Sequence, residues 1–346
     1  MSSAFDEALR QYDYELSPEL IANKPAHPRD SAKLVVLHRA TGNVTWSTFH
    51  DIAEFLPPRS LLVLNETKVI PARLTLTRAT GGHVSILRLK VERGLLHALS
   101  PKALRVGEHL KLAGKEMFVV DGRTEEAWLL RPLFPVHGMD ALFRKHGTMP
   151  IPPYIKKTPL TEHELRREYQ AVFAKKTGSI AAPTASLHFT THLLHDLEKS
   201  GVECARITLH VHLGTFAPLT EDQWSAGALH PEEYHIGARA MQQITHAKRE
   251  GRPIIAVGTT ALRTLESAAD SRGHIVHPEG TTQLFIREGH RFRITDGLIT
   301  NFHVPQSSLL MLVSAFAGRE KIFDVYREAM ERKFRFFSFG DAMLII

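Results

Sequence analysis

The stretch Ile254-Ile255-Ala256-Val257-Gly258-Thr259-Thr260-Ala261-Leu262 gives the strongest indication of the fold. Four consecutive apolar residues are typical of a strand covered on both faces, as in sheets flanked by helices. The glycine and two threonines that follow are typical of a helix N-terminus, where backbone N–H groups can bind an anion or a nucleotide. A plain capped helix explains the same residues, and the lack of a Gly-Lys-Ser/Thr sequence excludes a P-loop. We therefore expect an α/β domain around this strand.

The segments on either side predict further elements of the same domain. Apolar periodicity and stop signals place helices over 49–56, 187–199, 237–249, 307–317 and 320–333, and strands over 34–37, 44–46, 61–64 and 205–211. The strands over 34–37 and 44–46 are joined by a turn at Thr41-Gly42-Asn43, and we expect them to form a hairpin.

The segment from residue 73 to 147 has a different pattern. Short runs rich in β-branched and apolar residues, such as Val84–Leu89 and Met117–Val120, alternate with glycine-containing turns. Regularly spaced short strands predict a small all-β barrel. Because α/β segments flank it, we expect the barrel to be an insertion. The predicted domains are a discontinuous α/β domain of residues 1–72 and 148–346, and a barrel domain of residues 73–147.

The composition is that of a globular protein, with 43% hydrophobic and 23% charged residues among 346. A single cysteine, Cys204, excludes a disulfide framework, and we interpret it as a small hydrophobic residue of a strand. No apolar run approaches the ~20 residues that span a bilayer, and the first residues lack the features of a signal peptide. We expect a cytoplasmic protein that does not bind membranes.

The net charge is +6, and two groups of lysines and arginines stand out, at 156–176 and 327–335. Such groups either contact the phosphates of a nucleic acid or form solvated helix faces. Charge alone does not separate these two interpretations.

Residues 178–189 are small and irregular and end in Leu187-His188-Phe189. Small residues let a ligand approach the backbone closely. We expect His188 in the first turn of the helix over 187–199, where the helix dipole disfavours an imidazolium and leaves a neutral base. A structural hydrogen bond is a strong alternative, because the chain contains 21 histidines.

Three other short segments gather polar groups. They are 230–233 with His230 and Glu232, 296–305 with Asp296, Thr300, Asn301 and His303, and 334–341 with Arg335, Asp341 and four phenylalanines. The phenylalanines could stack on bases, but such residues more often belong to a core. None of the segments has the spacing of a metal site, and no nucleophile elbow or Gly-x-Gly-x-x-Gly sequence occurs.

Taken in order, these and other segments resemble the S-adenosylmethionine:tRNA ribosyltransferase-isomerases of queuosine biosynthesis. Each segment alone is modest, but the complete ordered set is highly specific and runs almost from end to end. The segments are Tyr12–Ala22, Asn65–Leu74, Met149–Ile155, Ala181–Thr184 with Leu187–Thr190, Gly258–Thr260 with Arg263–Glu266, Asp296–His303 and Gly340–Leu344.

This resemblance implies a large α/β domain interrupted by a β-barrel domain, which agrees with the predicted insertion. It also implies an enzyme that transfers the ribosyl part of S-adenosylmethionine to 7-aminomethyl-7-deazaguanine at the tRNA wobble position. The ribosyl part is isomerised to an epoxycyclopentanediol, which gives epoxyqueuosine, and adenine and methionine leave. S-Adenosylmethionine is then a co-substrate, tRNA is the partner, and no metal is implied. We expect a monomer.

Such a reaction needs a base beside the sulfonium, a donor for the departing adenine, and carboxylates near the cationic sulfur. The catalytic candidates are His188, Asp296, His303, Glu232 and Asp341, with His188 and Asp296 as first choices and His230 as a further possibility. The substrate-binding candidates are Thr184, Thr215, Phe216, Thr259, Thr260, Arg263, Glu266, Thr300, Asn301 and Arg335.

The chain departs from the family pattern at His212-Leu213, whose larger side chains could narrow a ligand site, and at residues 165–168, where the charges are reordered. These changes leave two alternatives open. One is a non-catalytic RNA-binding protein on the same scaffold, and the other is an S-adenosylmethionine-dependent enzyme that acts on a different nucleoside. The retained polar residues of the segments above favour the family reaction.

Overall fold

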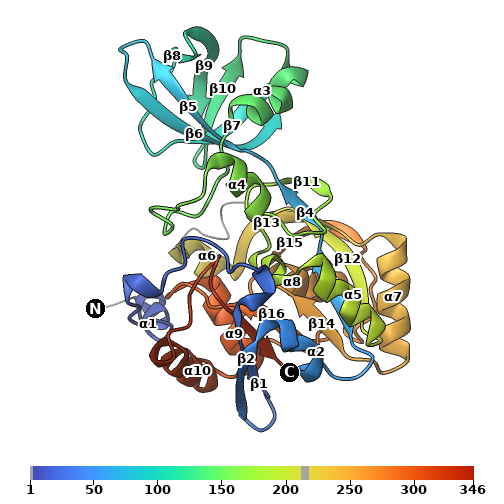
Figure 1. The fold of residues 1–346 in the computed structure, drawn as a ribbon. Helices are drawn as coiled ribbons and strands as arrows, with labels where there is room; N and C mark the ends of the chain where they lie inside the picture. Colours follow the sequence, from blue (N-terminus) through green and yellow to red (C-terminus); the bar gives the residue numbers. More distant parts are fainter. Residues whose placement is uncertain (1–2, 212–217) are drawn as a thin grey trace. The chain divides into compact units, whose positions relative to one another are not determined.

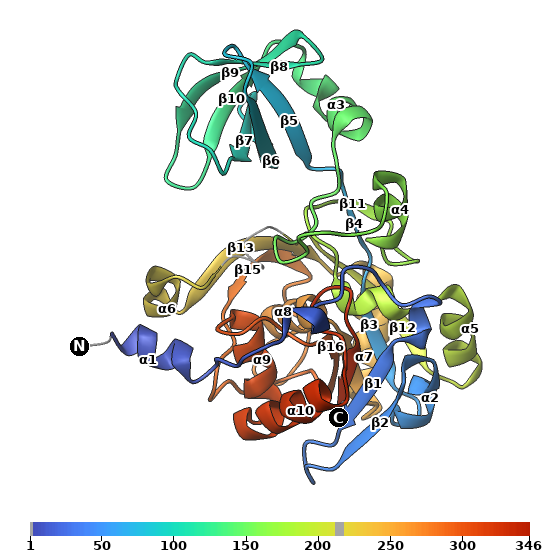
Figure 2. The ribbon, with the colours of Figure 1, turned by 60° about the vertical axis from the view of Figure 1, so that its left-hand side comes forward.

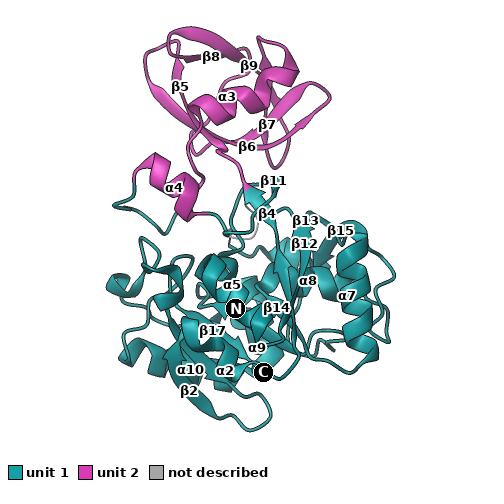
Figure 3. Ribbon diagram, turned by 45° about the vertical axis from the view of Figure 1, so that its right-hand side comes forward, with its two compact units in different colours: residues 1–68, 152–160, 170–346 teal, residues 69–151, 161–169 magenta. Residues whose placement is uncertain are grey.

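The computed structural model describes residues 3–211 and 218–346, and the chain divides into two compact units (Figure 3). The larger unit contains residues 1–68, 152–160 and 170–346, and the smaller unit contains residues 69–151 and 161–169. The segment predicted as a barrel, 73–147, lies inside the smaller unit. The larger unit is therefore assembled from three separate segments of the chain.

A nine-stranded sheet forms the centre of the larger unit, in the order β15-β13-β12-β3-β14-β16-β17-β1-β2 (Figure 1). Its strands are β1 (Lys33–Leu37), β2 (Val44–Thr48), β3 (Leu61–Asn65), β12 (Glu203–Leu209), β13 (Ala228–His235), β14 (Ile254–Val257), β15 (Glu279–Leu284), β16 (Gly297–Asn301) and β17 (Ala342–Ile345). The pairs β12–β3, β3–β14 and β14–β16 are parallel. The carboxyl ends of these four strands therefore lie at one edge of the sheet.

Helices cover both faces of this sheet. They are α1 (Ala4–Arg10), α2 (Ile52–Phe55), α5 (Thr191–Lys199), α6 (Glu221–Ala226), α7 (Ala238–Arg249), α8 (Thr259–Ala268), α9 (Ser308–Ala317) and α10 (Arg319–Glu331). Because successive strand residues point to opposite faces, Val63 joins the core beneath α7 to α10, whereas Leu62 and Leu64 join the core beneath α2 and α5. Figure 2 shows α9 and α10 on one side of the sheet and α2 and α5 on the other.

The smaller unit contains a closed six-stranded barrel in the order β10-β7-β6-β5-β8-β9. Its elements are β5 (Arg73–Arg78), β6 (His83–Glu92), β7 (Leu95–Leu99), β8 (His109–Leu112), β9 (Lys115–Arg123), β10 (Trp128–Pro132), α3 (Met139–His146) and α4 (Glu162–Glu168). Alternate residues such as Leu74 and Leu76 of β5 fill the interior. A separate two-stranded sheet pairs β4 (Thr67–Val69) with β11 (Lys176–Ser179). The predicted fold class, an α/β unit with a small all-β barrel, is confirmed.

Most predicted elements are confirmed, with two corrections. The β1–β2 hairpin and the helices α7, α9 and α10 lie where the sequence places them. The helix predicted over 187–199 is wrong at its start, since α5 begins at Thr191 and the Thr190 hydroxyl caps it by accepting the Leu193 N–H (3.0 Å). His188 therefore does not lie in the first turn of α5 but ends a short 3₁₀ helix, Thr184–His188. The helix over 49–56 is reduced to a 3₁₀ turn followed by α2.

Across the two described ranges, no helix is both long enough and apolar enough to cross a membrane.

Candidate functional site

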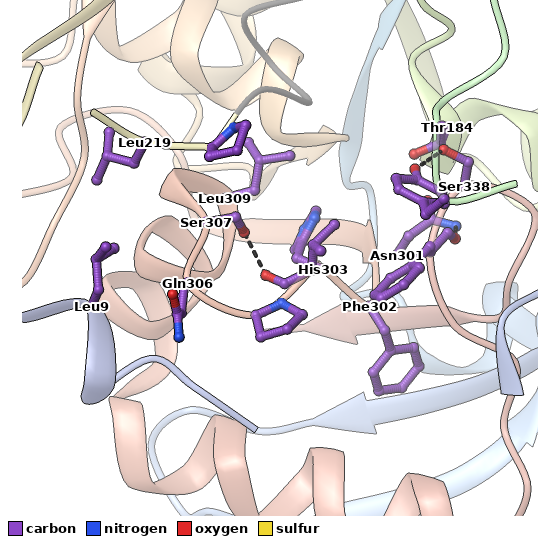
Figure 4. Close-up of a pocket in the computed structure, with 15 residues that line it drawn as sticks. Leu9, Thr184, Leu219, Asn301, Phe302, His303, Gln306, Ser307, Leu309 and Ser338 are labelled. Atoms are coloured by element: carbon purple, nitrogen blue, oxygen red, sulfur yellow. Dashed lines mark hydrogen bonds between the residues drawn. The ribbon is translucent and has the colours of Figure 1, made fainter. Parts of the chain in front are cut away.

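Two cavities that share lining residues lie at the carboxyl edge of the parallel strands. Figure 4 shows the residues that line the larger one. The larger has a volume of about 270 Å³ and the smaller of about 30 Å³. Both are lined by Thr184, Asn301, His303 and Leu309. In open α/β sheets, ligands bind outside the carboxyl ends of the strands, so this edge is where a substrate is expected.

The N-terminus of α8 opens onto the smaller cavity, which Gly258, Thr259 and Thr260 line. Gly258 has φ +89° and ψ 154°, a conformation that is essentially restricted to glycine. Its N–H donates to the Ile299 carbonyl (2.8 Å), which ties the strand–helix junction to β16. No side chain in the described part of the chain caps α8. The N–H groups of the first turn of α8 therefore have no capping side chain, and this turn lines the smaller cavity.

Asn65 connects this junction to the neighbouring strands, although it was not among the predicted site residues. Its Nδ2 donates to the Thr260 hydroxyl (3.2 Å) and to the Leu209 carbonyl (3.0 Å), and its Oδ1 accepts the Leu209 N–H (3.1 Å). An amide at the end of the otherwise apolar strand β3 is the sequence feature that could have identified it. Asn65 thereby holds the ends of β3 and β12 against α8.

His188 and Asn301 are hydrogen-bonded to each other beside the cavities. Asn301 Nδ2 lies 3.3 Å from His188 Nε2 and donates to the Phe337 carbonyl at 3.1 Å. The His188 ring packs on Phe49, with ring centroids 5.0 Å apart. Burial, together with the positive charges of Arg335 and Arg29, lowers the pKa of His188 to about 3. His188 is therefore neutral at pH 7.

His303 lines both cavities and is also neutral. Its Nε2 is 2.7 Å from the Thr300 hydroxyl, its N–H donates to the Tyr326 hydroxyl (2.9 Å), and its carbonyl accepts from Tyr14. Burial lowers the pKa of His303 to about 3. Its ring is thus uncharged at neutral pH and forms part of the wall of both cavities.

Asp341 forms an ion pair with Arg335 that includes two hydrogen bonds from the guanidinium. Asp341 Oδ1 accepts from Nη2 (2.7 Å) and Nε (3.1 Å) of Arg335, and Oδ2 accepts the Arg335 backbone N–H (2.8 Å). Asp341 is buried, whereas one third of the Arg335 side chain is exposed. Gly340 is required here, because a Cβ would lie 2.4 Å from the Arg335 carbonyl oxygen. Asp341 therefore positions a cation and does not face the cavities as a free carboxylate.

The chain is similar in sequence to a known protein family. The chain matches the family model described as Queuosine biosynthesis protein over residues 9–345. It is 44% identical to the S-adenosylmethionine:tRNA ribosyltransferase-isomerase of Pelobacter propionicus, over 97% of this chain and 99% of that protein. It is 46% identical to the protein of the same name from Carboxydothermus hydrogenoformans, over 98% of this chain and 99% of that protein.

The chain belongs to this family of queuosine biosynthesis proteins. A solved structure agrees: the S-adenosylmethionine tRNA ribosyltransferase from Thermotoga maritima is 35% identical and covers 97% of this chain and 100% of its own, with a TM-score of 0.55. The segments that carry the family resemblance meet at the cavities. Ala182–Thr184, Gly258–Thr260, Thr300–His303 and Tyr154 all line them.

Three other candidates lie in the interior and tie elements together. Glu232 of β13 forms a buried ion pair with Arg263 of α8, whose Nε also donates to the Leu284 carbonyl (3.0 Å). Glu266 accepts the backbone N–H groups of Arg293 (2.9 Å) and Thr295 (3.1 Å). Burial raises the pKa of Glu266, but the nearby His290 and the hydrogen bonds from these N–H groups outweigh it and bring the pKa below its usual value. None of the three lines either cavity.

Asp296, a first choice for catalysis, lies at the opposite edge of the sheet from the cavities. It precedes β16, and its Oδ2 accepts the N–H of Ile254 at the amino end of β14 (2.9 Å). The five residue steps to Asn301 span about 16 Å of extended strand. Its carboxylate is exposed and lines neither cavity, so the structure does not support the catalytic assignment of Asp296.

Other expectations for the site are also revised. Among the described residues, no aspartate or glutamate lines either cavity, so the carboxylates expected beside a sulfonium are not found there. His230 is on β13 and lines neither cavity. Thr215, Phe216 and His212-Leu213 lie outside the described residues, although their neighbours Val211 and Pro218 line the cavities.

The aromatic residues of the 334–341 segment belong to the core, as the more usual interpretation has it. Phe334, Phe336, Phe337 and Phe339 are all buried, and Phe337 also lines the larger cavity. Within residues 3–211 and 218–346, no three His, Cys, Asp or Glu side chains form a group that could hold a metal ion.

Proposed function

We propose that this protein is an S-adenosylmethionine:tRNA ribosyltransferase-isomerase that acts on 7-aminomethyl-7-deazaguanine in tRNA and forms epoxyqueuosine, with release of adenine and methionine. The observation that carries the proposal is the convergence at one edge of the sheet. Four family segments that are far apart in the sequence line the same two cavities there. S-Adenosylmethionine serves as ribosyl donor, no metal takes part, and the enzyme works as a monomer in the cytoplasm.

The linings of the two cavities suit different parts of S-adenosylmethionine. The larger has apolar walls from Leu9, Leu219 and Pro305 and an aromatic wall where Tyr154 packs on Phe337, with ring centroids 4.9 Å apart. Such walls favour a purine ring or a thioether chain. The smaller is lined by hydroxyl groups of threonines, including Thr184 and Thr259, which favour ribose hydroxyls. We assign the sugar to the region that the two cavities share.

The reaction needs a group that removes a proton beside the sulfonium. His303 is the catalytic candidate that lines both cavities, and we assign the proton transfer to it on the basis of this position. Its hydrogen bond to Thr300 keeps the ring oriented. Arg335, held by Asp341 and partly exposed, is suited to a phosphate of the RNA backbone because a guanidinium is a permanent cation with N–H donors.

Calorimetry of S-adenosylmethionine binding tests this assignment. We expect the wild type to bind the co-substrate, and Thr259→Val to bind it more weakly, by about 3- to 10-fold for one lost hydrogen bond. Thr281→Val, which changes an exposed threonine of β15 that lines neither cavity, is the matched control. Absence of binding to the wild type, with and without tRNA, would argue against the proposed co-substrate.

A further inference from the structure

Asn301 has an oxygen that the protein leaves without a hydrogen bond. The residue ends β16, lines both cavities and is 2% exposed. Its Oδ1 is buried and has no hydrogen-bond partner among the residues that the structure describes. Buried carboxamide oxygens are normally satisfied, so an unpaired one in a cavity wall indicates a position for a ligand donor.

The orientation of this carboxamide is determined by its neighbours. An amide NH₂ has two donors, and those of Asn301 are directed to the Phe337 carbonyl (3.1 Å) and to His188 Nε2 (3.3 Å). The reversed orientation would place Oδ1 against the Phe337 carbonyl oxygen, where two acceptors repel. Oδ1 is therefore the atom left for a ligand.

The same contact determines the state of His188. Since Nε2 accepts from Asn301, the neutral ring carries its proton on Nδ1. The Phe49 ring packs on His188, and the positive charges of Arg335 and Arg29 disfavour an imidazolium there. The Nε2 lone pair is already occupied, and His188 lines neither cavity.

We propose that Asn301 is the substrate-facing acceptor of this site, through Oδ1, and that His188 is a positioning residue which holds the carboxamide and does not act as the base. The ligand group is a single neutral N–H or O–H donor of a purine nucleoside. It is either the amino group of the adenine or a ribose hydroxyl. The identity of this ligand rests on the proposed function.

Binding of modified co-substrates distinguishes the two sources. Calorimetry would compare S-adenosylmethionine with three analogues that lack the adenine amino group, the 2′-hydroxyl or the 3′-hydroxyl. We expect Asn301→Ala to weaken binding of S-adenosylmethionine by about 3- to 10-fold, and to leave unchanged the binding of the one analogue that lacks the partner donor. Ser314→Ala is the control, because Ser314 Oγ is also buried and without a partner among the described residues but lines neither cavity. An equal loss for all four ligands would overturn the assignment of Oδ1.

The role of His188 is tested without any substrate. Nitrogen NMR of ring-labelled histidines, with His188 assigned by comparison with His188→Gln, reports which ring nitrogen carries the proton. We expect Nδ1–H in the wild type, and a proton on Nε2 in Asn301→Asp, where a carboxylate replaces the donor. An Nε2–H ring in the wild type would overturn the proposal. If no co-substrate binds while His188 carries its proton on Nδ1, the proposed function fails and the positioning of Asn301 stands.

Turnover provides a second test of the same role. Glutamine at position 188 retains an acceptor for the Asn301 NH₂, whereas leucine does not. We expect His188→Gln to keep adenine release within about 10-fold of the wild type and His188→Leu to lose more, because only glutamine can still hold the carboxamide. If His188 were the general base, both variants would lose roughly 100- to 10,000-fold. Equal and large losses in both variants would show that His188 is a base.

Discussion

His188 and His303 are buried imidazoles, and their burial makes the stability of the protein depend on pH. Burial lowers the pKa of each from its ordinary value of 6.5 to about 3. The unfolded chain therefore takes up protons at these residues as pH falls below 6.5, while the folded chain stays neutral down to about 3. The free energy of unfolding is then constant above this range and decreases as pH falls within it.

We expect a His303→Gln variant to be less sensitive to this fall in pH. Between pH 7.5 and pH 5, one such histidine costs the folded state about 2 kcal/mol, and the variant escapes that cost. Urea unfolding of both proteins at the two pH values measures the difference. If wild type and variant lose the same stability, His303 is not held neutral by the fold.

Variants of Asp296 distinguish a structural role of this side chain from a catalytic one. Its carboxylate accepts the Ile254 N–H at the edge opposite to the cavities. We expect Asp296→Ala to lower the free energy of unfolding by about 1 kcal/mol and Asp296→Asn to lower it less, because asparagine keeps an acceptor. Neither change should alter adenine release per folded molecule. Loss of turnover in Asp296→Asn, with the fold intact, would show that Asp296 has a catalytic role.

At the scale of elements, the junction between β14 and α8 could be predicted from the sequence because local physics decides it. Four apolar residues require cover on both faces, and the glycine permits the sharp turn that starts the helix. The start of α5 could not be predicted in the same way. Leu187 fits the apolar period of that helix, but the Thr190 cap, which excludes Leu187, is recognised only from the hydrogen bond it makes.

Residues at the two ends of one strand explain why the structure brings only some of the predicted site residues together. Asp296 and His303 are only seven positions apart in one segment, which the sequence suggests as a single polar group. β16 lies between them, so one is placed at the amino edge and the other at the carboxyl edge. The partners of Glu232 and Glu266 also depend on contacts between distant segments, which a single sequence does not reveal.

Gly258→Ala tests the importance of the β14–α8 junction. The φ of +89° and ψ of 154° are unfavourable for any residue with a Cβ, so we expect a loss of 1–3 kcal/mol of unfolding free energy, on the order of other strained positions. Co-substrate binding should fall as well, because the first turn of α8 lines the smaller cavity. Gly289→Ala, at a φ of +90° with open space around it, is the matched control for backbone strain alone. Equal binding by both variants would show that the junction does not shape the site.

For the whole molecule, charge is divided unevenly between the two units. Residues 69–151 and 161–169 contain 15 lysines and arginines against 10 aspartates and glutamates, a net charge of +5, whereas the complete chain has +6. The two groups of lysines and arginines noted in the sequence, at 156–176 and 327–335, lie mostly in the larger unit. A positively charged unit attracts a polyanion, and its contribution weakens with salt.

We therefore expect neutralisation of two exposed barrel cations, Arg93→Gln with Lys115→Gln, to weaken tRNA binding and to reduce its salt dependence. Arg239→Gln with Arg272→Gln, two exposed positions of the larger unit, is the matched control. Fluorescence titration of tRNA at several salt concentrations measures both quantities. An equal effect of the two double variants would show that net charge alone matters and that the barrel unit has no special part in binding.

Conversion of S-adenosylmethionine and modified tRNA into epoxyqueuosine by this protein can be followed through the products of the reaction. The purified protein would be incubated with S-adenosylmethionine and a tRNA that carries 7-aminomethyl-7-deazaguanine, followed by quantification of free adenine and of the mass of the modified nucleoside. We expect adenine release that requires the modified base, together with the mass gain of one isomerised ribosyl group. Binding of both partners without release of adenine would contradict it and would indicate a binding protein built on the scaffold of the family.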